Sequence, residues 1–304
     1  MQAGEGISIP ALAKELEKEC PFQEEDVDVA EVEDENIARD DLQTVMRAQA
    51  NNGGTLGKNL SNASPGKPAT LNKLYLPNTA EEDRPKDTKR NRGGKVKVTG
   101  DTEQYPFGVA AHHLIPGAAA LEKSRLNNYL VKGKKVTDSK KKSWKMKYHI
   151  GYNVNGCHNG VWLPGNYAIR KLVPPKKKSW GVLMDADPNW CLDYVCAAVK
   201  KTRRQFHDTH VQYSTAVQKT LNKIQTALLS HQSACRKCKK EDVIAPPYRI
   251  KVTLYNLSAW LKGQTSGAPD TWKLPYVTSD HWKGVLLASK TNRMFQKAYE
   301  KANP

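Results

Sequence analysis

The sequence predicts an α+β protein in which one folded domain, residues 101–304, follows a long polar N-terminal region. With 304 residues and 38% hydrophobic content, the chain can bury one sizeable core or two small ones. Helical apolar periodicity is strongest over residues 208–230, and shorter apolar runs lie near residues 111–116 and 159–164. Charge is also unevenly distributed, which separates the N-terminal region from the rest of the chain.

The N-terminal region begins with an acidic segment. Residues 1–45 hold 14 acidic residues against Lys14, Lys18 and Arg39, a net charge of −11. Because the whole chain carries +17, the remainder carries +28, and we expect the two parts to do different jobs. We interpret residues 1–50 as a solvated, partly disordered acidic segment. The alternative is an adaptor that binds a partner or folds back over the basic remainder.

Residues 51–100 form a predicted linker. Gly, Pro, Asn, Ser and charged residues dominate this stretch, and it lacks the apolar periodicity that helices and strands need. We therefore place the domain boundary near residue 100. No internal repeat of useful length is visible in the chain.

The charge of the whole chain indicates the class of partner. A net charge of +17 and a pI near 9.5 favour a polyanion, because clustered Lys and Arg displace counterions from phosphates. Nucleic acid is the first expectation, and an anionic membrane surface is the second. The sequence shows no signal-peptide pattern and no run of about 18 apolar residues, so we expect a soluble protein made in the cytoplasm.

Two lysine clusters in the basic part each have a tryptophan nearby. A charge run is commonly a solvated face, but an aromatic neighbour can stack on a base while lysines bind phosphates. We predict that both clusters bind nucleic acid and flank one site. Their residues are Lys140, Lys141, Lys142 and Trp144, and Lys176, Lys177, Lys178 and Trp180.

Two helices are predicted in the folded domain. The first covers residues 117–130, with Gly133 just beyond its end. The second runs from Asp208 to Ser230, where apolar residues recur every three or four positions. Asp208 or Thr209 can cap this helix, which places His210 in its first turn and His207 just ahead of it. Two imidazoles at a helix N-terminus can converge on one point.

Three blocks of the sequence carry side chains suited to phosphodiester cleavage. They are Ala111-His112-His113-Leu114-Ile115-Pro116, Cys157-His158-Asn159-Gly160-Val161-Trp162-Leu163-Pro164 and His207-Asp208-Thr209-His210-Val211-Gln212-Tyr213. Cleavage needs a base that deprotonates water, a cation that stabilises charge at phosphorus, and help for the leaving oxygen. A histidine supplies the base when an Asn carbonyl fixes its ring, and further imidazoles hold a divalent metal.

These blocks resemble the AHH family of the HNH/endonuclease VII superfamily, over roughly residues 105–230. The resemblance implies a ββα-metal (His-Me finger) nuclease core, in which a hairpin carries the paired histidines and the Asn, and a helix carries later ligands. It implies His113 as the general base and Asn159 as its orienter. His112 and His210, together with His207, would hold one divalent ion: Zn²⁺, Ni²⁺, Mn²⁺ or Mg²⁺.

The spacing of the blocks departs from a compact metal finger. About 45 residues separate His113 from Asn159, and a similar number separates Asn159 from His207, so Lys-rich insertions must leave and re-enter the site. The insertions leave open which later histidine binds the metal. His158 competes for a metal or phosphate role, against a structural or exposed interpretation, and His149 is a weaker competitor. Asn159 also fits a turn, because Asn-Gly is a turn signal.

Most members of the resembled family are toxin domains of bacterial secretion and competition systems. The resemblance implies a largely sequence-nonspecific DNase, with RNA as an alternative substrate, that acts as an antibacterial toxin. It implies injection into the cytoplasm of a target cell by a machine such as type VI secretion. It also implies a cognate immunity protein and a secretion-apparatus or chaperone partner for the N-terminal segment. The alternatives are a phage, restriction or repair nuclease, and a non-catalytic metal-containing nucleic-acid-binding protein.

Four cysteines suggest a structural zinc site. Cys235 and Cys238 have the two-residue gap of a zinc knuckle, and Cys191 and Cys196 lie about 40 residues upstream. The competing interpretations are buried thiols and a disulfide. In the remaining stretch, residues 243–304, we expect most aromatic side chains to lie in the core.

Overall fold

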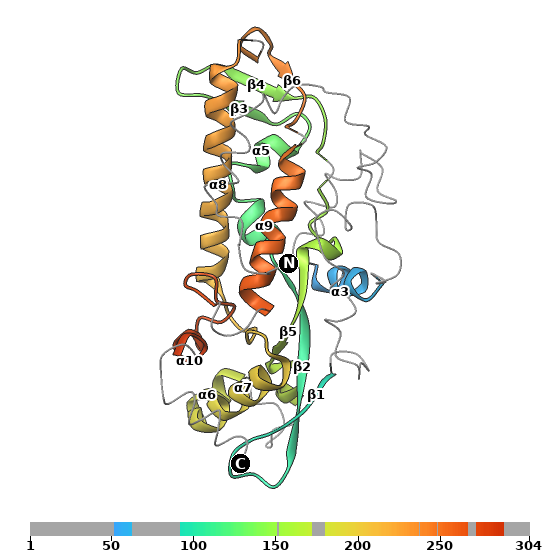
Figure 1. Cartoon of the computed structure of the whole chain (residues 1–304), viewed down its shortest axis with the longest axis vertical. Coiled ribbons are helices and arrows are strands. Elements are labelled where there is room, and N and C mark those ends of the chain that lie inside the picture. The colour runs from blue at the N-terminus through green and yellow to red at the C-terminus, as the bar shows by residue number, and fades with distance from the viewer. Residues whose placement is uncertain are drawn as a thin grey trace, which may run out of the picture.

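The computed structural model describes residues 52–62, 92–150, 152–171, 180–236, 238–247, 249–266 and 272–288. It confirms a mixture of helices and small sheets (Figure 1). The acidic segment 1–50 and the predicted lysine cluster 176–178 lie outside the described residues. The helices are α3 (Gly53–Asn62), α5 (Asn127–Leu130), α6 (Trp180–Ala186), α7 (Pro188–Thr202), α8 (Val211–Ala234), α9 (Arg249–Ser266) and α10 (Lys283–Ala288), with short turns η2 (Gly117–Leu121), η3 (Cys157–Asn159), η4 (Asn166–Lys171) and η5 (Cys238–Lys240).

The described strands form two three-stranded sheets. The first has the order β1 (Arg92–Lys97), β2 (Gln104–His113) and β5 (Gly160–Gly165), and both of its pairs are antiparallel. The second has the order β3 (Lys135–Thr137), β4 (Ser143–Met146) and β6 (Val243–Ile244). In the second sheet β3 and β4 form an antiparallel hairpin, and β6 joins β4 in parallel. The first sheet carries the paired histidines, so its register decides where they point.

Strand β2 is the centre of the first sheet. Its first half pairs with β1 and its second half pairs with β5, in a register that places His112 opposite Val161 and His113 opposite Gly160. Successive residues of a strand point to opposite faces, so these two histidines face different sides of the sheet. An isolated bridge from Gly165 to His207 then brings the segment before α8 to the end of β5.

Two hydrophobic cores lie on either side of this sheet region. The larger core contains apolar side chains of η2, α5, α8 and α9, among them Leu121, Leu221 and Leu254. The smaller core contains side chains of β1, β2, α6 and α7, among them Phe107 and Tyr194. In Figure 1 the long helix α8 runs from the sheet region to the β3–β4 hairpin, with α9 inclined beside it. The composition allowed either one sizeable core or two small ones, and the described residues form two.

Helix α8 forms where the apolar periodicity predicted a helix, but its start differs. The helix begins at Val211, and His210 occupies the N-cap position without a side-chain capping bond. The Val211 amide donates instead to Asp280 Oδ2, at 2.7 Å. Capping by Asp208 or Thr209 was therefore a wrong prediction, because an acid distant in sequence supplies the acceptor that a local side chain would otherwise provide.

The predicted helix over residues 117–130 is interrupted. It consists of η2 and α5, with a turn between them. In that turn the Ser124 hydroxyl donates to Leu121 O, and the Arg125 amide donates to Asn222 Oδ1 of α8. These side-chain bonds take up backbone groups that a continuous helix would have paired, which is a recognised way for polar residues to interrupt helices.

The predicted linker is partly wrong, because α3 and β1 fall within it: α3 packs on the first sheet and β1 is one of its strands. Leu56 and Leu60 of α3 are 0% and 2% exposed. A Cβ built on Gly160 would lie within 3.0 Å of both leucines, so the missing side chain lets α3 approach β5 closely. Gly57, one of the glycines that suggested a linker, permits the same approach, because a Cβ there would lie 3.1 Å from the Trp162 ring.

Candidate metal centre

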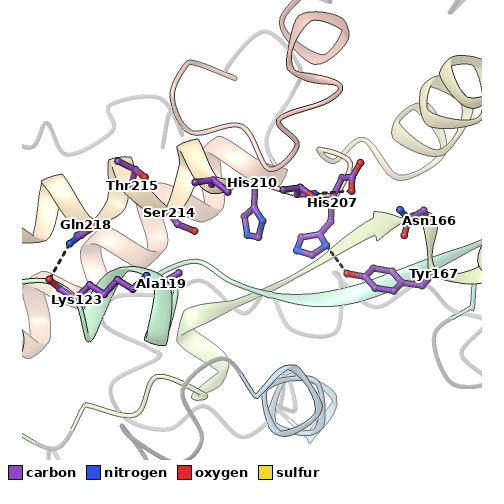
Figure 2. A pocket seen from close by; sticks show the side chains of 12 residues that line it. Ala119, Lys123, Asn166, Tyr167, His207, His210, Ser214, Thr215 and Gln218 are labelled. Carbon is purple, nitrogen blue, oxygen red and sulfur yellow. Dashed lines mark hydrogen bonds between the residues drawn. The ribbon is translucent and has the colours of Figure 1, made fainter. Parts of the chain in front are cut away.

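A pocket of about 540 Å³ opens at the N-terminus of α8 (Figure 2). Its walls come from the first turns of α8, from η2, from the start of η4 and from the segment that enters α8. The lining residues are Ala119, Lys123, Asn166, Tyr167, His207, Asp208, Thr209, His210, Val211, Ser214, Thr215 and Gln218. Polar side chains thus surround two of the histidines that the sequence singled out.

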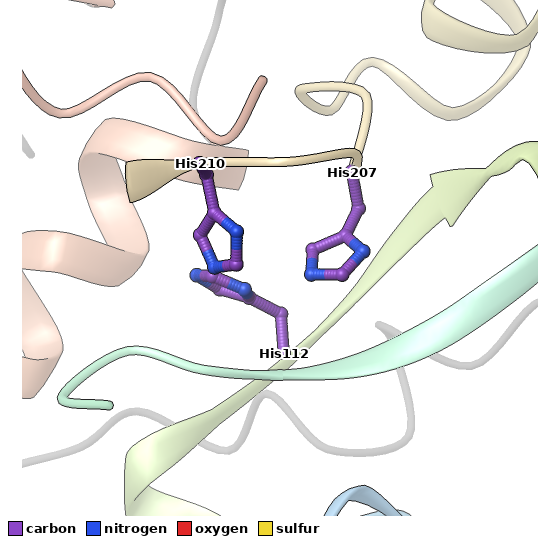
Figure 3. Close-up of side chains that lie close together, drawn as sticks. All are labelled: His112, His207 and His210. Atoms are coloured by element: carbon purple, nitrogen blue, oxygen red, sulfur yellow. The ribbon is translucent and has the colours of Figure 1, made fainter. Parts of the chain in front are cut away.

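Three histidines converge beside this pocket (Figure 3). The ring centroids of His112, His207 and His210 lie 4.9 to 5.0 Å from one another. One ring nitrogen from each lies within 4.8 Å of those of the other two. Among the described residues, this trio is the group of His, Cys, Asp or Glu side chains with that geometry. The sequence predicted His210 in the first turn of a helix, His207 just ahead of it and His112 at the start of an apolar run, and the fold brings the three together.

The backbone explains how the trio is assembled. The His207 amide donates to Pro164 O at 2.7 Å, which ties the segment before α8 to the end of β5. The neighbouring amide of Asp208 donates to Thr278 O at 3.1 Å. Strand β5 in turn pairs with β2, in a register that puts Pro164 opposite Val109 and His112 three residues further along β2.

The electrostatics of the trio suit a cation. Burial lowers the pKa of His112 well below its usual value, with a further contribution from the neighbouring His210 and His207. Burial also lowers the pKa of His210, although Asp280 and Asp208 partly oppose the shift. Both imidazoles are therefore neutral near pH 7, which is the state that binds metals. His112 Nε2 is buried and has no hydrogen-bond partner, so it is an orphaned nitrogen that a metal would satisfy.

A second layer of contacts orients His207. Its Nδ1 lies 2.9 Å from the Tyr167 hydroxyl, in a contact visible in Figure 2. A metal-binding imidazole commonly uses its other ring nitrogen in such a bond, which fixes the ring and its tautomer. Imidazole-only ligation favours Zn²⁺, Ni²⁺ or Mn²⁺ over Mg²⁺ by ligand preference. The residues present thus fit a divalent metal.

The sequence model of the AHH family, described as a nuclease family of the HNH/endonuclease VII superfamily with conserved AHH, matches residues 94–246. The chain belongs to this family. The matched region holds the paired histidines on β2 and all of α8, and it starts inside β1. Neither a curated protein nor a solved structure matches the chain. Within the described part of the chain, no helix combines the length and apolar character that crossing a membrane requires.

The second histidine of the AHH motif lies on the opposite side of the strand. His113 shares its face of the sheet with Gly160, which α3 covers, whereas His112 shares its face with the buried Val161. The exposed fraction of His113 is only 7%. Its Nε2 lies 2.8 Å from Asn155 Oδ1. Burial lowers the pKa of His113, and the hydrogen bond to Asn155 opposes part of that shift.

The partner of His113 is therefore Asn155, and the structure corrects the assignment to Asn159. Asn159 Oδ1 accepts hydrogen bonds from the Ile115 amide and the Ser258 hydroxyl. Its Nδ2 donates to Ile115 O and to Val154 O. The two bonds with Ile115 join η3 to the segment after β2, and the other two connect Asn159 to the preceding turn and to α9, so Asn159 holds the backbone beside the AHH strand and is not the partner of His113.

Three residues near the site were missed at the sequence level. Asn155, Tyr167 and Asn166 do not belong to the blocks that suggested the chemistry, although Asn166 lies two residues beyond the block that ends at Pro164. A weak signal existed for Asn155, which lies four residues before Asn159 in an Asn/Gly-rich stretch. Only the turn geometry shows which of the two reaches His113.

The first lysine cluster does not flank the trio. Trp144 is 1% exposed, and its Nε1 donates to Cys238 O, so it belongs to the core and cannot stack on a base. Lys142 forms an ion pair with Asp242. The hairpin is fixed near the far end of α8, where the Ser233 hydroxyl donates to Asp138 Oδ2 at 3.3 Å. Of the second cluster only Trp180 is described, and it too is buried, with Nε1 3.3 Å from Asp208 Oδ2.

The proposed four-cysteine zinc site is also wrong. Cys191 belongs to the smaller core on α7, whereas Cys238 belongs to the larger core and Cys235 packs against it. Burial raises the pKa of the Cys191 and Cys196 thiols to about 12, which opposes the thiolate form that zinc needs. The spacing of the cysteines could not reveal that two cores separate them.

The competing histidines lie away from the trio. His158 is buried with its ring between those of Tyr152 and Tyr255, at centroid distances of 5.2 and 4.3 Å. His149 is buried near α5, where its Nδ1 accepts from the Lys132 amide at 3.3 Å. Both positions fit the structural interpretation, and neither side chain lines the pocket.

Proposed function

We propose that this AHH-family nuclease is a metal-dependent, largely sequence-nonspecific endonuclease that cuts DNA. The observation that carries the proposal is the trio of His112, His207 and His210, which places neutral imidazoles beside a polar pocket. A strongly basic chain supports a nucleic-acid substrate, because phosphates attract Lys and Arg.

We assign the ββα-metal core to β2, β5 and α8. Strand β2 carries the paired histidines, Asn159 directly precedes its antiparallel partner β5, and α8 begins directly after His210. The insertion between β2 and β5 forms the β3–β4 hairpin and its surroundings, and the insertion between β5 and α8 forms α6 and α7. Both insertions return to the first sheet, which reconciles the long spacing with a compact site.

In this proposal His112, His207 and His210 hold one divalent ion, which would stabilise charge on the phosphate and on the leaving oxygen. Tyr167 keeps the His207 ring in the orientation that directs Nε2 toward the other two histidines. His113 serves as the general base that removes a proton from water. Since Asn155 Oδ1 can only accept, His113 Nε2 carries the hydrogen, and Nδ1 is left as the basic nitrogen.

The position of His113 sets a condition on this mechanism. Its ring faces α3, so the phosphate must reach Nδ1 around the end of β2 rather than through the sheet. If His113 were purely structural, His113→Ala would lower stability without a specific effect on turnover. The variant therefore tests the role of the base separately from the role of the metal.

We further propose that the nuclease acts as an antibacterial toxin, delivered by an apparatus such as type VI secretion and neutralised by an immunity protein. The support for this part is the family resemblance together with the acidic N-terminal segment. Expression in a bacterial cytoplasm tests it: a toxin stops growth, and His210→Ala abolishes the effect. A phage, restriction or repair nuclease would leave its host viable.

The test of the enzymatic proposal is cleavage of supercoiled plasmid and of RNA by the purified full chain. The reactions contain Mg²⁺, Mn²⁺, Ni²⁺, Zn²⁺ or EDTA, with wild type, His113→Ala and His207→Ala side by side. We expect metal-dependent nicking of DNA that both variants lose, while His113→Ala still binds metal. Cleavage in EDTA, or no cleavage of either substrate with any metal, would overturn the proposal.

A further inference from the structure

Asn166 is a polar residue of the pocket that the proposed mechanism does not use. It is the first residue of η4, directly after β5, and it lines the pocket together with His207 and His210 (Figure 2). The residue is 1% exposed. Its Nδ2 is buried and has no hydrogen-bond partner. A buried amide nitrogen without a partner raises the free energy of the folded state, so we expect a ligand to accept a hydrogen bond from it.

The backbone holds Asn166 at the edge of the trio. Gly165 bridges to His207, and a Cβ on Gly165 would lie 2.9 Å from His207 O and 2.8 Å from the Tyr167 ring. The chain therefore passes His207 at a distance that only glycine permits, and Asn166 follows immediately. Rotation about the terminal torsion of the Asn side chain, which has a broad energy minimum, can turn Nδ2 toward the pocket.

The rest of the pocket favours an anionic, extended ligand over a neutral one. The wall opposite Asn166 contains Ser214, Thr215 and Gln218 of α8, together with Lys123 after η2. Ser214 and Thr215 supply hydroxyl groups and Lys123 supplies an ammonium group, while the Gln218 amide already donates to Lys123 O at 3.0 Å. From His210 to Gln218 the helix rises by about 12 Å, which exceeds the spacing of about 3.4 Å between successive phosphates of one duplex strand. The acid in the lining, Asp208, is engaged with the Trp180 indole, the His281 ring and the Thr209 amide.

We propose that the Asn166 amide donates a hydrogen bond to a non-bridging phosphate oxygen of the nucleic acid and so positions the strand against the trio. The proposal rests on the proposed nuclease function and adds to it a substrate-binding residue outside the motif blocks. Asn166 carries no proton in the reaction and holds no metal. Its contribution is a donor that the fold leaves without a partner until substrate arrives.

The stability of Asn166 variants gives a first distinction. A residue retained for packing would cost stability when truncated, whereas removal of an unpartnered buried amide removes an unfavourable group. We expect Asn166→Ala to melt at or above the wild-type temperature, measured by differential scanning calorimetry on the metal-free full chain. Melting far below wild type would contradict a substrate-binding role and indicate a structural one.

The decisive experiment measures substrate and metal binding separately. The full chain in EDTA is titrated against a fluorescein-labelled 12-nucleotide DNA strand, and Ni²⁺ binding is measured by calorimetry without DNA. Variants are Asn166→Ala, the isosteric Asn166→Asp and a matched control, Gln264→Ala. Gln264 also has a buried unpartnered amide atom, but it does not line the pocket.

We expect Asn166→Ala to weaken DNA binding about tenfold, the typical value of a hydrogen bond to a charged group, and Asn166→Asp to weaken it further by repulsion. Both should bind Ni²⁺ within about twofold of wild type and raise KM more than they lower kcat. Unchanged DNA binding in Asn166→Ala, with an active wild type, would overturn this inference alone. A loss of Ni²⁺ affinity would instead make Asn166 a ligand. A wild type that neither binds nor cuts nucleic acid would overturn both proposals.

Discussion

Burial lowers the pKa of His112, His113 and His210, so the stability of the folded chain should depend on pH through these three side chains. An unfolded histidine titrates near pH 6.5, so between that value and the lower folded pKa the unfolded chain binds more protons. The contribution of these histidines to the free energy of unfolding is therefore fully present above about pH 6.5, and it is lost as the pH falls below that value. We predict that the metal-free chain needs less urea to unfold at pH 5 than at pH 7. His112→Asn should flatten this dependence, because it removes the imidazole whose pKa burial lowers well below its usual value.

The two asparagines near His113 predict different phenotypes. Asn155→Ala removes the bond that partly offsets the lowered pKa of His113, so the pKa falls further and the acidic limb of the pH–rate profile moves to lower pH. Asn159→Ala leaves buried backbone groups without partners and should cost about 2–4 kcal/mol of unfolding free energy. Urea denaturation and pH–rate profiles of both variants test this. If Asn159→Ala shifted the pH–rate profile and Asn155→Ala lost the stability instead, Asn159 would be the residue that orients His113.

At the level of residues, the sequence allowed the ligands to be predicted better than their surroundings. His112, His207 and His210 could be found because imidazoles in ordered blocks are chemically distinctive. Which amide reaches His113 depends on the turn at residues 153–156, just before η3, and sequence spacing does not determine that turn. The tryptophans were assigned to a surface because lysines surround them, although their large apolar area favours burial.

Among the elements, α8 could be predicted because its apolar stripe recurs at helical spacing from Val217 to Leu228, over about three turns. Helix α3 could not be predicted, because Leu56 and Leu60 are the buried side chains among those of α3 that the structure describes, and Gly, Asn and Thr lie around them. Such a short helix is stable only through its tertiary contacts. The interrupted segment of η2 and α5 illustrates the opposite case, where helical composition gives way to side-chain bonds from Ser124 and Asn222.

The contact of α3 with the sheet yields a prediction of its own. Leu60→Ala should destabilise the protein by about 2–4 kcal/mol, because the leucine is buried against Gly160. Asn59 Nδ2 also donates to Asn155 O, so loosening α3 should lower the activity of His113 as well. Urea denaturation and plasmid nicking measure the two effects. The exposed Lys58→Ala is the control, and an active, fully stable Leu60→Ala would show that α3 does not support the site.

In the whole molecule, the β3–β4 hairpin and the trio lie at opposite ends of α8. Asp138 contacts Ser233, which is 23 residues beyond His210, or about 35 Å along the helix. One turn of a DNA duplex has nearly the same length. Lys140 and Lys141 of the hairpin can therefore contact a duplex whose phosphate one turn away lies at the trio. This placement replaces the prediction that the lysines flank the catalytic site.

That placement predicts how affinity depends on salt. The double variant Lys140→Ala/Lys141→Ala should bind a 30-base-pair duplex more weakly and reduce the slope of log K against log salt by up to about two. Turnover at saturating duplex should stay within about twofold, because the trio is untouched. Lys200→Ala/Lys201→Ala on α7 removes the same charge and serves as the control. If both double variants lost the same affinity for the duplex, the effect would come from net charge and not from a contact at Lys140 and Lys141.

We propose that His112, His207 and His210 hold the metal on which cleavage depends. The most direct test titrates the metal-free full chain with Ni²⁺, Mn²⁺ or Zn²⁺ while plasmid nicking is followed. We expect nicking to be absent without metal and to rise to a plateau near one metal ion per chain. His210→Ala should need more than about 100-fold more metal, because it loses a ligand of the ion itself. Nicking by wild type in EDTA, or an unchanged titration in His210→Ala, would contradict the claim.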